Sequence, residues 1–500
     1  LDFILDRQQG NLDEVVVVGY GTQKRKTVTG AVSSVKAGDL ENMPVVRVEN
    51  SLQGRISGVQ VTANSGQPGD ASKVRIRGTS SLTAGTDPIY VVDGVIIGGG
   101  TDFLNQSDIE SIDVLKDAAS AAIYGTQASN GVILVTTKKG RSGKVAVNYN
   151  GYVGTQAPWR KLKLLNATEY ATLQNEALLN GGKPIRYSNP AALGEGTDWQ
   201  AAIMNNNAFI QNHELSLSSS TDKSSYYTSF GYFDQDGIVA TSNSFYKRFT
   251  ARFNSTHKVN SRITLGNNIA YAFVRSRGVG TNSEWGTPLN RAINLDPLTP
   301  LVVTDPAIAG QAPYTNSPYV VRDGFGNPYG ISTVVTSEIL NPLAALQIDQ
   351  GFGWSHKITG NIFGEVEIIK GLKFRSQVNG DLAFWGSEGF TPLYYLNTIN
   401  KNEDLNSYTR SQNRGLFYIW DNTLTYDKKI GNHSINVLAG TSAQKNKGES
   451  ISATKRGIPV NNIRDASMIF PVPAENQSSG GGEYLSTLAS LFGPITYEYI

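Results

Sequence analysis

The chain has 500 residues and almost no net charge, because 44 Lys plus Arg are matched by 42 Asp plus Glu. A balance of +2 excludes the broadly basic surface of a nucleic-acid-binding protein, so no nucleic-acid partner is predicted. Charged residues make up only 17% of the chain and glycine reaches 52 residues, which favours turn-rich all-β structure. The absence of cysteine excludes disulfides, thiolate metal sites and cysteine nucleophiles.

No stretch of the sequence is a candidate membrane helix, which needs roughly 18 consecutive apolar residues. The N-terminus also lacks the basic and apolar regions of a signal peptide, so we expect Leu1 to be a processed or cut end. Composition therefore leaves open a large soluble β-rich protein. The periodicity of the apolar residues is needed to decide.

The first predicted element is a short strand within residues 1–21. Its residues are Asp13, Glu14, Val15, Val16, Val17 and Val18. Valine on both faces favours pairing at a sheet edge, and Gly19 to Gly21 ends the strand. One alternative is an ordinary internal strand of the next domain. A dinucleotide-binding loop is disfavoured, because Lys24 stands where its third glycine is required.

Residues 22–142 are predicted to form a compact α+β domain. Between residues 109 and 124 apolar side chains recur at spacings of three and four, which predicts an amphipathic helix. The β-branched run from 132 to 137 predicts a strand, and residues 138–140 end the domain. Glycine-rich turns at 66–69 and 98–100 permit positive φ or close backbone approach.

From residue 143 to residue 500 the apolar residues alternate at every second position. In 263–273 the odd positions apart from Asn267 are large and apolar, while the even positions are small or polar. Such alternation suits tilted membrane strands, which need about 9–11 residues, although a soluble sandwich shows it too. We predict about ten strands, near residues 144–156, 211–220, 224–234, 246–257, 262–275, 354–368, 372–384, 414–427, 433–444 and 486–499.

The connections between these strands alternate between tight turns and long loops, which is typical of outer-membrane barrels. Unpaired backbone groups in hydrocarbon each cost several kcal/mol, so an open sheet cannot lie in lipid. The alternating run at 485–500 has no terminating turn. We therefore expect the sequence to stop inside a larger barrel, and a barrel of the 22-stranded type would need about 430 further residues.

Several segments resemble the SusC/RagA-type TonB-dependent transporters of Bacteroidota outer membranes. They are LDEVVVVGYG at 12–21, LQGRISGVQV at 52–61, VRIRGTSSL at 74–82, PIYVVDGV at 88–95 and DIESIDVLKDAASAAIYGTQASNGVILVTTKKG at 108–140. The resemblance implies an all-β transmembrane barrel of the 22-stranded type, with about ten strands present in this sequence and an N-terminal α+β plug domain in the lumen. It divides the chain into an extension with a TonB box (1–21), a plug (22–142) and the first part of the barrel with long extracellular loops (143–500).

The resemblance also implies a function. Residues 13–18 would be the TonB box, which joins the sheet of TonB by β-augmentation and receives energy from the ExbB/ExbD complex. The barrel would import glycans or oligopeptides beneath a SusD-like surface lipoprotein, in contact with outer-membrane lipid. The resemblance also allows a dimer of SusCD pairs. The alternative is a SusC-like structural subunit of an outer-membrane assembly or secretion complex with no import role.

Three charged plug residues are candidates for contacts with the barrel wall that break when the plug moves, namely Arg75, Arg77 and Asp93. Static ion pairing is the favoured alternative, because a plug in a polar lumen needs polar contacts to stay in place. Aromatic residues in the predicted loops are candidates for substrate or lid contacts, and their alternative is an interface girdle or loop packing. The candidate aromatic residues are Trp159, Trp285, Trp385 and Tyr394.

No catalytic site is predicted. The four histidines each stand at the edge of a predicted strand, far apart in the sequence, and no hydrolase or phosphate-binding motif occurs. Glu365 and Glu367 share one strand face, which fits a wet lumen wall better than an acid and base pair. The sequence therefore predicts a non-enzyme with no cofactor and no metal site.

Overall fold

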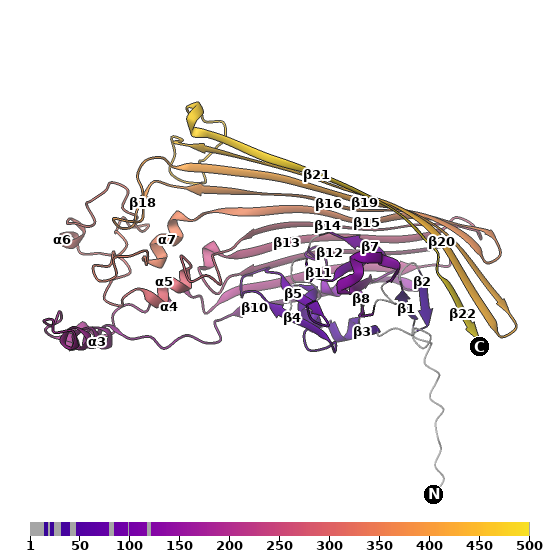
Figure 1. Cartoon of the computed structure of the whole chain (residues 1–500), viewed down its shortest axis with the longest axis horizontal. Helices are drawn as coiled ribbons and strands as arrows, with labels where there is room; N and C mark the ends of the chain where they lie inside the picture. The colour runs from indigo at the N-terminus through magenta and orange to yellow at the C-terminus, as the bar shows by residue number, and fades with distance from the viewer. Residues whose placement is uncertain are drawn as a thin grey trace, which may run out of the picture.

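The computed structural model describes residues 15–18, 21–24, 32–40, 47–79, 85–98, 100–117 and 122–499. Figure 1 shows a long curved sheet, here called the wall, and a smaller N-terminal domain against it, here called the plug. The fold class predicted from the sequence is confirmed: a many-stranded antiparallel wall follows an α+β domain. Within the described part of the chain, no helix has the length and apolarity that a membrane crossing requires.

The wall is a single meander. Each long strand pairs antiparallel with the next long strand along the chain, and β22 pairs with β20 off this path. Its strands are β10 (Gly143–Gln156), β11 (Ala208–Ser220), β12 (Ser224–Asp236), β13 (Phe245–Lys258), β14 (Ile263–Arg277), β15 (Gln350–Ile369), β16 (Leu372–Thr391), β19 (Ser407–Ile430), β20 (His433–Arg456), β21 (Gln477–Phe492) and β22 (Ile495–Tyr499).

The two faces of the wall differ because the side chains alternate. On β13, Arg248 and Arg252 face the plug and are each 4% exposed, whereas Phe249 and Phe253 on the opposite face are 51% and 47% exposed. A continuous exposed apolar face is suited to lipid, and a polar inner face is suited to a lumen. On β13, the alternation therefore fixes which side chains meet the plug.

Tight turns and long loops lie at opposite ends of the wall, as the sequence predicts. In Figure 1 the long loops lie at the left and carry short helices. In the first loop the Asn166 side chain caps a helix by accepting the backbone N–H of Glu169 at 2.8 Å, and the Glu169 carboxylate accepts the backbone N–H of Asn166 at 3.0 Å. These helices were not predicted: α3 (Ala167–Asn180), α4 (Trp199–Ile203), α5 (Pro288–Asn294), α6 (Pro306–Ala309) and α7 (Pro342–Ile348).

The plug contains a mixed five-stranded sheet in the order β3-β8-β9-β6-β7, in which β6 and β9 run parallel. A separate pair, β4 and β5, packs beside it. Apolar clusters cover both faces of the five-stranded sheet, and the run Val132 to Val135 of its central strand β9 is entirely apolar. The bounds are β3 (Val32–Lys36), β4 (Val59–Ala63), β5 (Ser72–Ile76), β6 (Ile89–Val92), β7 (Val95–Ile97), β8 (Ile109–Leu115) and β9 (Val132–Thr137).

The predicted helix at 109–124 is wrong. Ile109–Leu115 is the strand β8, paired with β3 on one side and β9 on the other. Ile112, Val114 and Leu115 are all 0% exposed, because the strand is buried on both faces. Its apolar residues stand at 109, 112, 114 and 115, because burial on both faces removes the regular alternation, and these spacings also fit a helix. Residues 118–121 lie outside the described residues, and Ala122–Asn130 forms 3-10 turns interrupted at Gly125.

The orientation of the wall predicts how charge is tolerated along its outer face. Ile362 on β15 is 62% exposed, in the middle of the apolar band, and Ile451 on β20 is 59% exposed, close to the end that carries the long loops. Arginine at a bilayer midplane costs about 2–4 kcal/mol and near the interface about 0–1 kcal/mol. We expect Ile362→Arg to destabilise the full-length protein in bilayers by the larger amount and Ile451→Arg by the smaller, as measured by urea titration. Equal costs would contradict the assignment of the outer face.

Candidate functional site

The central contact between plug and wall is made by one arginine. The Arg252 side chain, on β13, is 3% exposed. Its Nη1 lies 3.6 Å from Asp93 Oδ2, and its Nε lies 3.3 Å from Asp108 Oδ2. Both carboxylates belong to the plug and are 5% and 2% exposed. One wall cation therefore faces two plug anions in an interface that excludes water.

A tight hairpin presents Asp93 to the wall. Strands β6 and β7 are joined by Asp93 and Gly94, whose φ angles are +49° and +85°. A two-residue turn with positive φ at both positions is the type that Asp-Gly favours. The Asp93 carboxylate then accepts the backbone N–H and the hydroxyl of Thr137 at 2.9 and 2.6 Å. Contacts within the plug thus fix the position of the Asp93 carboxylate without any help from the wall.

Further wall side chains complete the network around Arg252. The Tyr227 hydroxyl donates to Asp108 Oδ1 at 2.8 Å, and Asn254 Nδ2 donates to Thr137 Oγ1 at 2.9 Å. Asn254 lies two residues from Arg252 and so on the same face of β13. The two plug carboxylates are held by neutral donors as well as by the cation.

A second group of contacts between plug and wall is centred on Arg248, four residues before Arg252 on the same face of β13. Arg248 donates to the backbone carbonyls of Asp102 and Leu104 at 3.1 and 3.4 Å and to Asn105 Oδ1 at 2.8 Å. Asn105 in turn donates from Nδ2 to Thr250 Oγ1 at 2.6 Å. The contacts are to backbone oxygens and an amide, so Arg248 holds the plug by hydrogen bonds.

A third group joins Gly98 and Gly100 of the plug to β15 and β16. Lys357 Nζ donates to the carbonyls of Gly98 and Gly100, each at 3.1 Å, and lies 3.4 Å from Asp381 Oδ1. Asp381 Oδ2 accepts the Gly98 N–H at 2.9 Å. A turn without side chains lets wall residues approach the plug backbone directly.

The network is not fully satisfied. Among the described residues, Arg252 Nη2 and Glu214 Oε2 are buried atoms with no hydrogen-bond partner. A buried polar atom left unpaired costs about 1–3 kcal/mol.

Comparison with known proteins supports a specific family. Residues 24–132 match the TonB-dependent Receptor Plug Domain. The chain is 32% identical to TonB-dependent receptor P26 of Formosa agariphila over 98% of the chain and 47% of that protein. It is 30% identical to TonB-dependent receptor SusC of Bacteroides thetaiotaomicron over 100% of the chain and 49% of that protein. The chain belongs to the SusC-like TonB-dependent receptor family.

Solved structures agree on the fold of this receptor. The structure of the RagAB peptide importer in the open-open state matches with a TM-score of 0.80 at 23% identity, over 97% of this chain and 55% of that one. The receptor sequence spans about half the length of the curated relatives it matches. It is an outer-membrane protein, and its relatives are named as receptors and transporters, in agreement with the prediction that it is not an enzyme.

The three charged residues chosen from the receptor sequence occupy different places. Asp93 contacts Arg252 of the wall. Arg77 instead pairs with Asp117 inside the plug at 2.5 Å. The pKa of Lys116 is lowered by burial and by the nearby positive charge of Arg77. Arg75 lies on β5, and its buried Nε has no hydrogen-bond partner among the described residues. Whether any of these contacts breaks in function remains a prediction.

The four aromatic candidates are not gathered at one site. Trp159 and Trp285 are 97% and 66% exposed in the loops. Tyr394, in the short strand β17 (Tyr394–Tyr395), packs against an apolar loop cluster. Trp385 lines a cavity at the junction of plug and wall. Their contacts with substrate or lid are still predictions.

The segment predicted as the TonB box is described in part. Val15–Val18 is strand β1, which pairs antiparallel with β2 (Gly21–Lys24). Asp13 and Glu14 lie outside the described residues. A short extended strand that precedes the plug has the conformation that β-augmentation requires.

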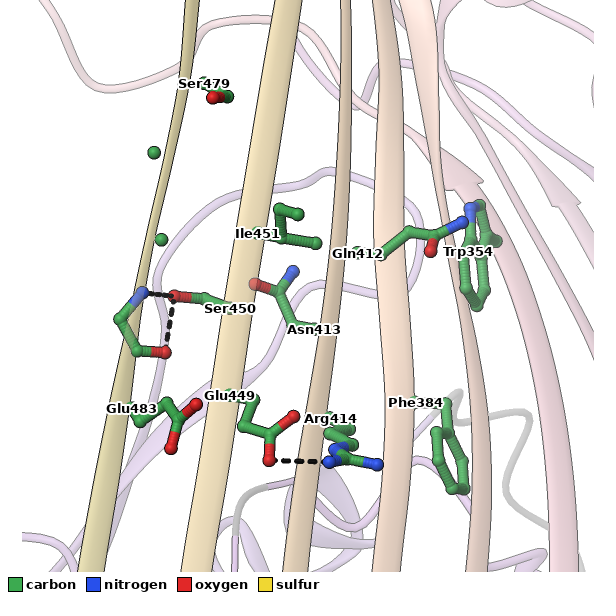
Figure 2. Close-up of a pocket in the computed structure, with 13 residues that line it drawn as sticks. Trp354, Phe384, Gln412, Asn413, Arg414, Glu449, Ser450, Ile451, Ser479 and Glu483 are labelled. Atoms are coloured by element: carbon green, nitrogen blue, oxygen red, sulfur yellow. Dashed lines mark hydrogen bonds and ion pairs between the residues drawn. The ribbon is translucent and has the colours of Figure 1, made fainter.

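A hollow of about 990 Å³ lies on the other side of the wall (Figure 2). Trp354, Phe384 and Arg414 belong to the lipid-side set of alternating residues and line it. Arg414 Nη2 is 2.5 Å from Glu449 Oε1, and Lys447 Nζ is 2.7 Å from the same oxygen. Because this hollow opens away from the plug, it has no part in the plug contacts.

The sequence did not identify the wall residues that hold the plug. These residues lie at plug-facing positions of strands whose side chains alternate between the two faces; they are Arg248, Arg252, Asn254, Lys357 and Asp381. The available signal was a charged or amide side chain at several successive inward positions, as at 248, 252 and 254. Which plug atoms they meet depends on tertiary packing.

We predict that Arg252 holds the plug in place. Arg252→Met leaves two buried carboxylates without their cation, and breaking a buried pair costs about 3–5 kcal/mol. In the full-length receptor, hydrogen exchange of residues 89–108 should accelerate strongly. The matched control is Arg410→Met, which breaks a pair with Glu388 at 3.0 Å whose arginine is 42% exposed and should cost at most about 1 kcal/mol. Equal exchange in both variants would show that the buried contact does not hold the plug.

Proposed function

We propose that this receptor imports large nutrients, glycans or oligopeptides, across the outer membrane in a TonB-dependent way. The observation that carries the proposal is the polar contact between plug and wall through Arg252, Asp93 and Asp108. A plug held by ion pairs and hydrogen bonds can be released, because water can replace each partner when the plug shifts. A plug joined to the wall by a large apolar interface could not be released so easily.

Energy would enter through residues 13–18. We infer that this segment leaves its hairpin with β2 and adds to the sheet of TonB, which the ExbB/ExbD complex drives. Each backbone hydrogen bond is worth only about 0.5–1.5 kcal/mol net, so the contact can be made and released in each cycle. The β1–β2 hairpin has four residues in each strand, which keeps its opening inexpensive.

The partners follow from the same proposal. A SusD-like surface lipoprotein would cover the long loops, and pairs of this kind could dimerise through the barrel. Support comes from relatives, since one matched structure is named as the RagAB peptide importer. That title names peptides for RagAB; for this receptor both glycans and oligopeptides are proposed substrates.

The test is deletion of residues 13–18 in the full-length protein. We expect uptake of, and growth on, the cognate nutrient to fall to the level of a strain without the gene, because the plug can no longer be pulled. A deletion of residues 3–8, upstream of the strand, serves as the control and should leave uptake intact. Surface amounts of both variants are measured by cell-surface labelling.

Unchanged uptake after removal of residues 13–18 would overturn the import proposal. If the same strain instead showed a defect in envelope assembly or secretion, the receptor would be a structural subunit, which is the second candidate function. The two outcomes are read from one pair of strains.

A further inference from the structure

The outer face of the wall carries a cluster of charged side chains around one acid. Arg414 on β19 and Lys447 on β20 both contact the same carboxylate oxygen, Glu449 Oε1, at 2.5 and 2.7 Å. Their side chains are 47% and 36% exposed, so the cluster is open to its surroundings. Lys445 lies two residues from Lys447 on the same face of β20 and adds a third cation.

The strands place this cluster at the loop-side border of the apolar band. On β19 the outward positions from 416 to 426 hold no charged residue, and Arg414 is the next outward residue toward the loops. On β20 the outward positions from 435 to 443 hold none, and Lys445 is the next. The apolar band of such a barrel is about 25 Å tall and ends where the lipid headgroups begin. The cluster therefore lies at the level of the headgroups.

The same charged residues form one row of the hollow of about 990 Å³. Four residues paired in register on neighbouring strands follow one another across the hollow (Figure 2); they are Phe384, Arg414, Glu449 and Glu483. The next outward row, two residues nearer the loops, is Gly386, Gln412, Ile451 and Gly481. Because two members of that row have no side chain, space is left above the charged row.

Both sides of the hollow are fixed by close packing. Ser450 Oγ accepts the backbone N–H of Gly482 at 3.1 Å and donates to the carbonyl of the same residue at 3.3 Å. A Cβ on Gly481 would lie 2.4 Å from the Ser450 carbonyl oxygen, so only glycine allows this approach. On the other side, a Cβ on Gly386 would lie 2.8 Å from the Trp354 indole, so the ring packs directly on the glycine.

The charges favour a ligand that is an anion. Glu449 and Glu483 stand directly opposite each other on β20 and β21, and like charges in this position repel. Arg414, Lys447 and Lys445 outnumber these two acids, so the net charge of the cluster is positive. Because Arg414 and Lys447 share one oxygen of Glu449, they are held side by side. Paired cations of this kind suit a phosphate, which offers several oxygens to N–H donors.

The membrane supplies an occupant with matching chemistry. Acyl chains cover the apolar band, so a headgroup attached to them stands at the level of Arg414 and Lys447. A phosphate on that headgroup would meet the two cations, and a sugar ring would fit the space beside Trp354. Basic pockets at the border of the bilayer recognise phosphorylated lipid headgroups in this way. Aromatic side chains also favour this level of the membrane.

We propose that the hollow is a binding site for a phosphorylated glycolipid of the outer leaflet, with Arg414 and Lys447 on its phosphate and Trp354 beside its sugar. Glu449 positions the two cations and competes with the phosphate for them. The site lies on the face of the wall opposite to the plug, so the lipid would hold the outside of β16 to β21 and stay out of the lumen.

The experiment is native mass spectrometry of the purified full-length receptor in detergent. The probes are diphosphoryl lipid A, the same lipid after phosphatase treatment, and phosphatidylethanolamine. We expect diphosphoryl lipid A to bind most tightly, and Lys447→Gln to raise the Kd of this complex roughly fivefold, which is the contribution of one basic residue at a charged membrane surface. Glu449→Gln should lower the Kd, because it frees both cations for the phosphate.

The matched control is Lys428→Gln. Lys428 is an exposed residue on the same face of β19 as Arg414, but it lies at the turn end, beyond the apolar band, so its substitution should leave the Kd unchanged. Equal binding of the phosphorylated and phosphatase-treated lipids, equal weakening by Lys428→Gln and Lys447→Gln, or weaker binding by Glu449→Gln would each overturn the proposal. A lipid-free dimer that Lys447→Gln dissociates would also overturn it, because a second copy of the chain would then fill the hollow.

Discussion

Arg252 lies between Asp93 and Asp108 with all three side chains withdrawn from water. Withdrawing charges from water costs several kcal/mol each, and the cost is offset only when the opposite charges and neutral donors stand in place. Strand β13 must therefore have its correct register, the Asp93-Gly94 turn must close, and Tyr227 and Asn254 must reach their partners. The position of the plug in the wall depends on this set of conditions.

The wall and the plug are stabilised by different forces. In the described part of the chain, the main apolar core of the plug is built from the plug's own residues, to which the wall adds Ala270 and Ala272. Between plug and wall the contacts are mostly directional and polar, as at Lys357 and Arg248. When two surfaces separate, the free energy of apolar burial is lost in proportion to the area exposed to water. Polar groups, in contrast, can exchange their protein partners for water. The plug can thus remain folded while its contacts with the wall are replaced.

Alternation along the chain was enough to predict the wall, because lipid and lumen impose opposite chemistry on successive residues of a strand. Thus 263–273 was placed correctly in β14, while β20 extends to Arg456, beyond the apolar stretch that signalled it. Strand β8 was mistaken for a helix because burial on both faces erases the alternation. The loop helix α3 carries a capping box at Asn166, a local signal that was overlooked. Asp93 was selected from its charge, but its partner Arg252 is far away in the sequence and only packing brings the two together.

The plug contacts on β13 come from alternate residues, 248, 250, 252 and 254, which share one face. A slip of the strand by a single residue would turn Phe249 and Phe253 toward the plug and two arginines toward hydrocarbon. Each buried arginine would cost about 2–4 kcal/mol near the midplane. The plug carboxylates Asp93 and Asp108 would also lose their cationic partner Arg252, so the plug could not dock. A docked plug is therefore evidence of a correctly aligned wall. During biogenesis, only a wall whose strands are paired in the correct register would allow the plug to dock.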